Sequence, residues 1–251
     1  MNILITGASS GIGRDMAKYL DKSDNKLILV ARDKKKLEEL QKELKTVSEI
    51  YFCDLKNMNE VRKLYDTYKN KIDFLINNAG FGLFGLFYET DLEKELEMID
   101  VNIKAVHVLT KLFLQDFVKK DSGRILNVCS SAGFMAGPRL NTYYATKNYV
   151  TKLTMAINEE LRRMKSHVHI SALCPGPVNT NFNKVANGFF EIKGATSEYV
   201  ARYGIEKCLK NKMIIVPTFK IKLGIFMLRF IPFRLQLMII YHIQKKKSVI
   251  S

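Results

Sequence analysis

The chain has 251 residues, of which 47% are hydrophobic and 26% are charged, and this balance excludes a disordered or fibrous protein. Its formal net charge is +15, from 40 Lys and Arg against 25 Asp and Glu. The amino-terminal residues lack the charged and apolar regions of a secretory signal, and the four scattered cysteines form no disulfide or metal-binding pattern. We therefore expect a cytoplasmic protein with reduced thiols, three of them buried in strands, and no bound metal.

Short apolar runs alternate with longer amphipathic stretches along the whole chain. Aliphatic strands separated by helices indicate a parallel sheet that is covered on both faces. We expect a doubly wound α/β (Rossmann) fold with a seven-stranded parallel sheet and right-handed crossovers. The predicted strands are residues 2–6, 26–30, 49–53, 73–77, 124–129, 167–173 and 213–216. The predicted helices are residues 12–21, 34–45, 57–69, 92–118, 141–164 and 197–210.

The first predicted strand runs directly into the segment "TGASSGIG", residues 6–13. Gly7 permits a tight turn, Gly11 lets the backbone approach a pyrophosphate, and Gly13 lets the next helix pack close to the sheet. The amino terminus of that helix offers free N–H groups and the positive end of its dipole to phosphates. The position at the start of an α/β chain favours a dinucleotide-binding turn over a plain glycine turn.

The end of the second predicted strand indicates which dinucleotide is bound. An acid at this position bonds the ribose hydroxyls of NAD, but here Ala31 occupies it and Arg32 follows. A guanidinium can bind the 2′-phosphate of NADP bidentately, so we expect NADP. The alternative is that Arg32 is a solvated surface charge. Asp33 is expected to point outward or to cap the helix that begins near Lys34.

Six motifs occur in the order that is typical of one family. They are "TGASSGIG" at 6–13, "NNAG" at 77–80, "VNIKA" at 101–105, "NVCSSAG" at 127–133, "YYATK" at 143–147 and "CPGPVNT" at 174–180. On these motifs the chain resembles the short-chain dehydrogenases/reductases, in the single-domain branch of about this length. The resemblance extends through about residue 217 and implies an oxidoreductase that uses a nicotinamide dinucleotide.

The family's Tyr-x-x-x-Lys pair assigns the catalytic acid. Only Tyr143 has a lysine four residues later, Lys147, and four residues is about one helical turn, so both side chains leave the same face. Tyr144 is rotated by about 100° and has Asn148 at the equivalent offset. The resemblance therefore implies that Tyr143 is the acid, and we expect Tyr144 to be a pocket-wall or packing residue.

The resemblance also supplies a serine and an asparagine. Alignment of Asn127 and Gly133 with the family pattern "N-x-x-S-x-x-G" selects Ser130, and Ser131 would point to the other side if strand geometry persisted. Asn102, in "VNIKA", matches the asparagine that holds a water in the family's proton relay. The predicted catalytic residues are Asn102, Ser130, Tyr143 and Lys147.

The chemistry of carbonyl reduction requires these residue types. Hydride addition places negative charge on the carbonyl oxygen, which needs a hydrogen-bond donor and then a proton. A free phenol has a pKa near 10, too high for ready proton exchange at neutral pH. We expect the ammonium of Lys147 to lower the pKa of Tyr143, and Ser130 to donate a second hydrogen bond to the oxygen.

The resemblance implies the remaining cofactor contacts. Asp54 should reach the adenine, Asn78 should line the cleft, and Thr180 should meet the nicotinamide carboxamide, although Thr180 equally suits a helix N-cap. Lys147 should also bond the nicotinamide ribose. The predicted cofactor-binding residues are Gly7, Ser9, Ser10, Gly11, Ile12, Gly13, Arg32, Asp54, Leu55, Asn78, Ala79, Gly80, Tyr143, Lys147, Pro175, Gly176, Val178 and Thr180.

The expected function is NADP-dependent transfer of a hydride between the nicotinamide and a carbonyl or alcohol substrate. The alternative is a catalytically idle dinucleotide-binding or regulatory protein on the same fold. Phe and Leu in the segments 81–87, 134–142 and 181–196 favour an apolar substrate, unless these side chains only pack the loops. Relatives form dimers or tetramers through the helices predicted at 92–118 and 141–164.

The last predicted element follows the dehydrogenase domain of residues 1–217, which includes the substrate loop 181–196. Residues 218–251 are apolar and basic, and ten Lys or Arg but no acid follow Glu206. Charges and Pro232 interrupt every window of 18, so we expect two short helices hinged near Pro232 rather than a spanning helix. This segment favours an anionic lipid surface over nucleic acid, and a second subunit or the domain itself are the alternatives.

Overall fold

The predicted strands form a single parallel sheet in the computed structural model, which describes residues 1–180, 182, 188–189, 194–245 and 248–249. The strand order is β10-β6-β5-β4-β1-β2-β3. From β1 the chain adds strands first on one side, as β2 and β3, and then on the other, beginning with β4, as in a doubly wound sheet. The strands are β1 (Asn2–Thr6), β2 (Lys26–Ala31), β3 (Val47–Phe52), β4 (Phe74–Asn77), β5 (Arg124–Val128), β6 (His169–Leu173) and β10 (Ile214–Ile215).

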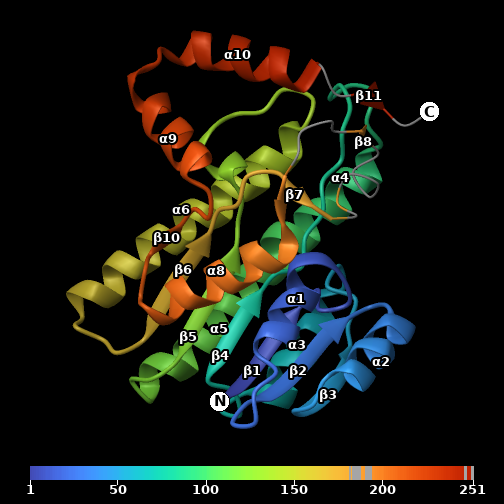
Figure 1. Ribbon diagram of the computed structural model, residues 1–251, viewed down its shortest axis with the longest axis vertical. Helices are drawn as coiled ribbons and strands as arrows, with labels where there is room; N and C mark the ends of the chain where they lie inside the picture. Colours follow the sequence, from blue (N-terminus) through green and yellow to red (C-terminus); the bar gives the residue numbers. More distant parts are fainter. Residues whose placement is uncertain (181, 183–187, 190–193, 246–247, 250–251) are drawn as a thin grey trace.

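Helices cover both faces of this sheet (Figure 1). Ile3 and Ile5 of β1 pack in a core cluster with α1, α2 and α8, whereas Leu4 between them packs in a second cluster with α3, α5 and α6. Both faces of the strand are buried, which explains why its sequence is apolar without alternation. The helices are α1 (Gly11–Tyr19), α2 (Lys34–Glu43), α3 (Met58–Tyr68), α4 (Leu92–Ile99), α5 (Val106–Lys119), α6 (Asn141–Arg163) and α8 (Ser197–Leu209).

The helix predicted at 92–118 is not one regular helix. A π-helical segment, η1 (Asp100–Ala105), lies between α4 and α5 and carries Asn102, which is buried. A π-segment widens the helix by one residue per turn without interrupting its apolar pattern, so the sequence periodicity could not predict it. Such segments occur frequently at functional sites, and this one directs Asn102 toward α6, where its amide donates to the Thr146 hydroxyl.

The four cysteines are free thiols with buried side chains. Their expected placement in strands is wrong by one residue at three positions, because Cys53, Cys129 and Cys174 each follow the last residue of β3, β5 and β6. Cys208 lies in α8. The difference concerns the terminal residue alone, because the backbone N–H of each of these cysteines still donates to a carbonyl of the neighbouring strand, at 3.2 Å for Cys53, 2.8 Å for Cys129 and 2.7 Å for Cys174.

The C-terminal segment forms the two short helices that the sequence predicts. They are α9 (Phe219–Met227) and α10 (Phe233–Lys245), joined by the short turn η3 (Leu228–Phe230). Gln236 holds the bend, because its side-chain amide donates to the carbonyls of Leu228 at 2.8 Å and Ile231 at 2.7 Å. We call residues 218–245 the tail, and Figure 1 places it at the end of the molecule opposite the amino terminus.

Beyond the tail, β11 (Ser248–Val249) pairs antiparallel with β8 (Gly188–Phe189). Two further short strands, β7 (Val178–Asn179) and β9 (Ala195–Thr196), pair in parallel. Most of the predicted substrate loop, including Phe190, lies outside the described residues. Among the described residues, no helix is both long enough and apolar enough to cross a membrane.

Candidate active site

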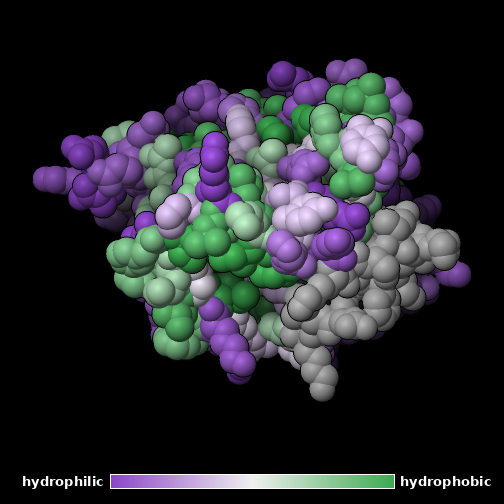
Figure 2. Space-filling view, turned by 90° about the horizontal axis from the view of Figure 1, so that it is seen from above, coloured by the Kyte–Doolittle hydropathy of each residue, from purple (hydrophilic) through white to green (hydrophobic). Residues whose placement is uncertain are grey.

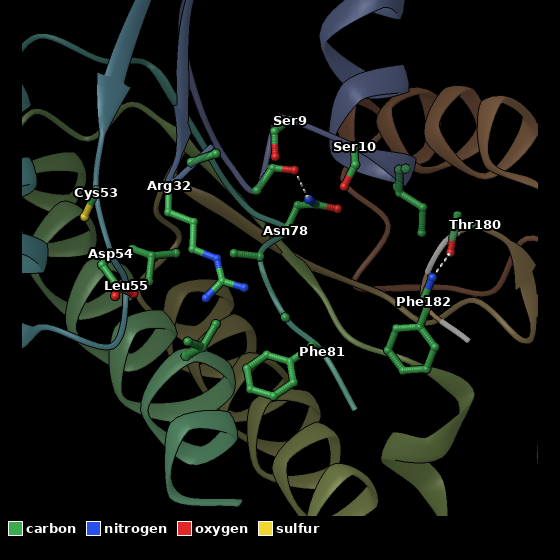
Figure 3. A pocket seen from close by; sticks show the side chains of 17 residues that line it. Ser9, Ser10, Arg32, Cys53, Asp54, Leu55, Asn78, Phe81, Thr180 and Phe182 are labelled. Carbon is green, nitrogen blue, oxygen red and sulfur yellow. Dashed lines mark hydrogen bonds between the residues drawn. The ribbon is translucent and has the colours of Figure 1, made fainter. Parts of the chain in front are cut away.

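A cleft of about 280 Å³ opens at the carboxyl edge of the sheet, in the region where the strand order reverses (Figure 3). The residues that line it follow the ends of β1, β2, β3 and β4. Twelve of the predicted cofactor-binding residues are among them: Gly7, Ser9, Ser10, Gly11, Ile12, Arg32, Asp54, Leu55, Asn78, Ala79, Gly80 and Thr180. The remaining lining residues, which are not among the predicted cofactor-binding residues, are Ala31, Cys53, Phe81, Val101 and Phe182.

The glycine-rich turn has the conformation that its sequence predicts. Gly7 and Gly11 have φ angles of +66° and +52°, in the left-handed region that favours glycine. A Cβ atom on Gly7 would lie 2.8 Å from the Cα atom of Ala79. Gly13 does not line the cleft, and a Cβ there would overlap the side chain of Asn78. The turn therefore leaves a bare backbone cradle at the start of α1, as a phosphate group requires.

Asn78 fixes this cradle to the sheet. Its side-chain amide donates to the carbonyl oxygens of Thr6 at 3.0 Å and Gly7 at 3.1 Å. Its backbone N–H donates to the Thr6 hydroxyl at 3.0 Å. These bonds tie the ends of β1 and β4 together, so Asn78 stabilises the central strands as well as lining the cleft.

Arg32 extends from the end of β2 into the cleft, with Asp54 and Leu55 on one side and Phe81 on the other (Figure 3). Within the described part of the chain, its guanidinium forms no hydrogen bond or ion pair. The neighbouring Asp33 points away as the N-cap of α2 and accepts the N–H of Lys36 at 3.1 Å. An unpaired guanidinium beside a backbone cradle fits a phosphorylated dinucleotide, and these residues therefore suit the expected cofactor.

A second pocket adjoins the cleft, and Thr180 and Phe182 line both. The hydroxyl of Thr180 accepts the backbone N–H of Phe182 at 3.2 Å, as a helix cap would. Four predicted cofactor residues, Tyr143, Pro175, Gly176 and Val178, line this second pocket rather than the cleft. The pocket is lined by Ser130, Ser131, Ala132, Leu140, Tyr143, Tyr144, Pro175, Gly176, Pro177, Val178, Thr180 and Phe182.

Tyr143 and Lys147 lie one turn apart on α6, as the spacing predicts. The Lys147 ammonium is 5.8 Å from the centroid of the Tyr143 ring and donates to the Val128 carbonyl at 2.9 Å. Lys147 is only 6% exposed, so its side chain is held in one position beneath the pocket. Tyr144 also lines the pocket, which confirms the expected pocket-wall position.

Ser130 ends the extended segment after β5 and caps the short helix η2 (Ser131–Phe134). Its hydroxyl accepts the N–H of Ala132 at 3.1 Å and lies close enough to Tyr143 to lower the pKa of that phenol. Ser131 begins η2, so the expected strand alternation does not reach it, and both serines line the pocket. The contact with Tyr143, rather than alternation, distinguishes Ser130.

The electrostatics of the pair differ from the sequence-based expectation. Burial raises the pKa of Tyr143 above its ordinary value, and the nearby Ser130 hydroxyl offsets part of this increase. Burial lowers the pKa of Lys147. The expected lowering of the Tyr143 pKa by the ammonium is therefore not seen in the protein alone. Removing both groups from water disfavours their charged forms more than their mutual attraction favours them.

Asn102 projects from η1 toward both the cleft and α6. Its amide donates to the Phe81 carbonyl at 2.8 Å and to the Thr146 hydroxyl at 3.1 Å, and its oxygen accepts the Phe81 N–H at 3.1 Å. Both amide hydrogens are used within the protein. Asn102 thus holds the cleft-lining loop at Phe81 against α6, and the water contact implied by the resemblance stays a prediction.

The family model described as short chain dehydrogenase matches residues 1–188, which include the cradle, Ser130, Tyr143 and Lys147. The chain belongs to the short-chain dehydrogenase family. It is accordingly an oxidoreductase, and the seven-stranded sheet is the fold of that family.

Curated relatives of this short-chain dehydrogenase include an uncharacterized oxidoreductase of Staphylococcus saprophyticus, 34% identical over 184 residues, covering 70% of this chain and 78% of the relative. Dehydrogenase/reductase SDR family member 11 of Bos taurus is 32% identical over 220 residues, covering 82% of this chain and 84% of the relative. Among solved structures, a short-chain dehydrogenase from Sphingobium yanoikuyae in complex with NADPH has a TM-score of 0.83 at 26% identity. The match covers 91% of this chain and 92% of that one.

The tail of this short-chain dehydrogenase contacts the second pocket at two points that its sequence did not predict. A Cβ on Gly176 would lie 2.6 Å from Ile221 of α9, so Ile221 packs directly on this pocket residue. Gln244 of α10 donates to the Tyr144 hydroxyl at 2.7 Å and is 2% exposed. The tail thus forms part of the wall behind the pocket.

Proposed function

We propose that this protein is an NADP-dependent oxidoreductase that interconverts a carbonyl compound and its alcohol. The observation that carries the proposal is that Ser130 and Tyr143 line one pocket, with Lys147 one turn away from Tyr143, and that this pocket adjoins the cleft at the glycine-rich turn. The NADPH-bound relative from Sphingobium yanoikuyae supports the choice of cofactor.

The side chains divide the work of carbonyl reduction. The glycine-rich cradle and Arg32 would hold the cofactor, which would supply the hydride for the carbonyl carbon. Tyr143 donates its hydroxyl proton to the carbonyl oxygen, and Ser130 donates a second hydrogen bond that stabilises the developing charge. Lys147, held by the Val128 carbonyl, orients the catalytic turn and meets the cofactor ribose. The reverse sequence oxidises the alcohol.

The pocket walls favour an apolar substrate. Leu140, Pro177, Val178 and Phe182 line the second pocket, where charged side chains are absent from the described lining. A sugar or a charged acid would leave its polar groups unpaired against these walls. The predicted division into a domain of residues 1–217 and an extension of residues 218–251 fits this arrangement, because all four proposed catalytic residues precede Pro217.

Cofactor preference tests the proposed role of Arg32. Wild-type protein should bind NADPH at least about tenfold more tightly than NADH, because charge-assisted bonds to a phosphate contribute roughly 1.5–3 kcal/mol. Fluorescence titration gives both dissociation constants. Replacing Ala31 with Asp and Arg32 with Ala should reverse the preference.

Lys34→Ala is the matched control for this experiment. The Lys34 side chain is 68% exposed and does not line the cleft. Its replacement therefore removes the same charge as the loss of Arg32, two residues away in the sequence. This variant should keep the wild-type preference. Equal dissociation constants for the two cofactors in the wild type, or loss of preference in the control, would contradict direct phosphate recognition by Arg32.

A catalytically idle dinucleotide-binding protein is the second candidate function. It would use the same cleft but would not require Ser130 and Tyr143 in one pocket. Single-turnover mixing with NADPH and a ketone separates the two: the idle protein would bind the cofactor and leave it reduced.

Assembly into a homodimer or homotetramer is part of the proposed function. Leu96 on α4, Tyr149 on α6 and Met164 at the end of α6 are exposed apolar side chains on the helices that relatives use. Light scattering should give a multiple of the 28.8 kDa chain mass. The four free thiols fit the reducing conditions of the cytoplasm.

The partner proposed for the tail is an anionic membrane surface. The basic residues Lys220, Lys222, Arg229 and Arg234 are exposed, and no acid occurs after Glu206. Full-length protein should sediment with anionic lipid vesicles at low salt and much less at high salt, since salt screens exposed charges. Sedimentation that is indifferent to salt would contradict the role of these charges.

A further inference from the structure

The outer side of the tail is a continuous apolar surface. On α9 and the turn after it, Phe219, Leu223, Phe226, Met227 and Phe230 recur at the spacing of one helical face, and each is 47–76% exposed. Figure 2 looks down on this end of the molecule and shows apolar side chains gathered in a patch from which single hydrophilic side chains project. We call this surface the apolar face.

The apolar face continues onto α10. Phe233, Leu235, Met238 and Ile239 are 42–63% exposed, while Ile240 and Gln244 are the buried residues of this helix. A helix that is apolar on nearly all sides is normally buried in a core or in lipid. Here α9 has no buried residue, so the described part of the chain leaves this surface uncovered.

The inner side of the same two helices reaches the second pocket. Ile221 of α9 packs on Gly176, and Gln244 of α10 bonds the hydroxyl of Tyr144. Gly176 and Tyr144 line the pocket together with Tyr143. One layer of helix therefore separates the apolar face from the site of the proposed chemistry.

Charge decides between the occupants that could cover the apolar face. The segment after Glu206 has ten basic residues and no acid, and the four basic residues at 220, 222, 229 and 234 are exposed beside the apolar ones. A second copy placed face to face by a two-fold axis would bring these like charges together. An anionic lipid surface instead accepts both the charges at its headgroups and the apolar side chains below them.

We propose that the apolar face seats this protein on an anionic membrane and that the pocket behind it takes lipid-dissolved carbonyl or alcohol substrates. The substrate class rests on the proposed function. A substrate with a long apolar chain would pass from the bilayer into a pocket walled by Leu140, Pro177, Val178 and Phe182, without crossing water. The reaction is the same hydride and proton transfer, so the carbonyl compound is reduced to its alcohol and NADPH is oxidised.

A triple variant isolates the apolar face from the pocket. Phe226, Phe230 and Phe233 are 50%, 68% and 63% exposed and do not line the pocket. Replacing all three with Ser leaves the inner contacts of Ile221 and Gln244 in place. The matched control replaces Val47, Phe52 and Leu209 with Ser, because these are exposed apolar residues outside the tail.

Two readouts are measured on full-length protein. The first is co-sedimentation with vesicles of phosphatidylglycerol and phosphatidylcholine. The second is NADPH oxidation with a short water-soluble ketone in buffer and with a long-chain ketone carried in the same vesicles. We expect the triple variant to bind vesicles at least about tenfold less, since three apolar side chains lose their burial. Its turnover of the vesicle-borne ketone should fall in parallel, while turnover of the soluble ketone and both readouts of the control stay unchanged.

Three outcomes would overturn the inference. If the wild-type protein does not sediment with the vesicles, the proposed membrane contact is wrong. A triple variant with an altered oligomeric mass and unchanged vesicle binding makes the apolar face an interface between copies. Equal loss on both ketones shows that the substitutions damage the pocket rather than access from lipid. If neither ketone is reduced by the wild type, the proposed function and the substrate class fail together, and co-sedimentation alone still decides the membrane contact.

Discussion

Replacing Tyr143 with Phe should lower turnover by about 10²–10⁴-fold, the usual contribution of a positioned acid–base group. The substitution removes only the hydroxyl and leaves the ring against Phe182, 5.2 Å away between centroids. The cofactor cleft does not depend on this hydroxyl. NADPH affinity, measured by fluorescence titration, should therefore stay close to the wild-type value.

Tyr144→Phe is the matched control, because it removes the same atom from the adjacent residue. The Tyr144 hydroxyl accepts a hydrogen bond from Gln244 and bonds no residue of the proposed catalytic set. This variant should retain most of its turnover. If Tyr144→Phe lost activity and Tyr143→Phe kept it, the assignment of the acid from its spacing to Lys147 would be wrong.

Gly7→Ala should weaken cofactor binding. A non-glycine residue at a φ of +66° costs about 1–2 kcal/mol, and the new Cβ would also contact the Ala79 backbone at 2.8 Å. To avoid this contact, the turn would have to move away from β4, which would distort the cradle. We expect NADPH affinity to fall at least about tenfold, the equivalent of 1.4 kcal/mol, together with a lower midpoint of thermal unfolding.

The matched control is Gly224→Ala, which adds the same methyl group to α9. No atom lies within 4 Å of a Cβ at this position. Alanine is favoured over glycine inside a helix by roughly 0.5–1 kcal/mol, so this variant should be at least as stable as the wild type and should bind NADPH normally. A Gly7→Ala variant with wild-type affinity would show that the cradle does not hold the phosphates.

The sheet was accessible to sequence analysis because its strands are buried on both faces. A run such as residues 2–6 is apolar throughout, since Ile3 and Leu4 face different layers of helices. The interruption of the helix at 92–118 was not accessible. In the π-segment, Asn102 bonds Phe81 and Thr146, which lie in distant parts of the chain. Local periodicity does not predict such contacts.

Residues of the candidate site could be predicted from the sequence where they lie within a family motif or next to one. Phe81 directly follows "NNAG", and Val101 begins "VNIKA", so both missed lining residues could have been found from the motifs. The contact between Gln244 and Tyr144 joins residues 100 positions apart and has no local signal. The raised pKa of Tyr143 was also missed, because burial depends on packing that spacing alone does not reveal.

The most direct test of the central claim is the initial rate of NADPH oxidation by full-length protein with ketones of graded chain length. We predict saturable turnover that depends on Tyr143, is faster with NADPH than with NADH at low cofactor concentration, and has a KM that falls as the apolar chain lengthens. Tight binding of NADPH without oxidation by any ketone, or of NADP⁺ without reduction by the matching alcohols, would contradict a carbonyl reductase and favour the idle dinucleotide-binding protein.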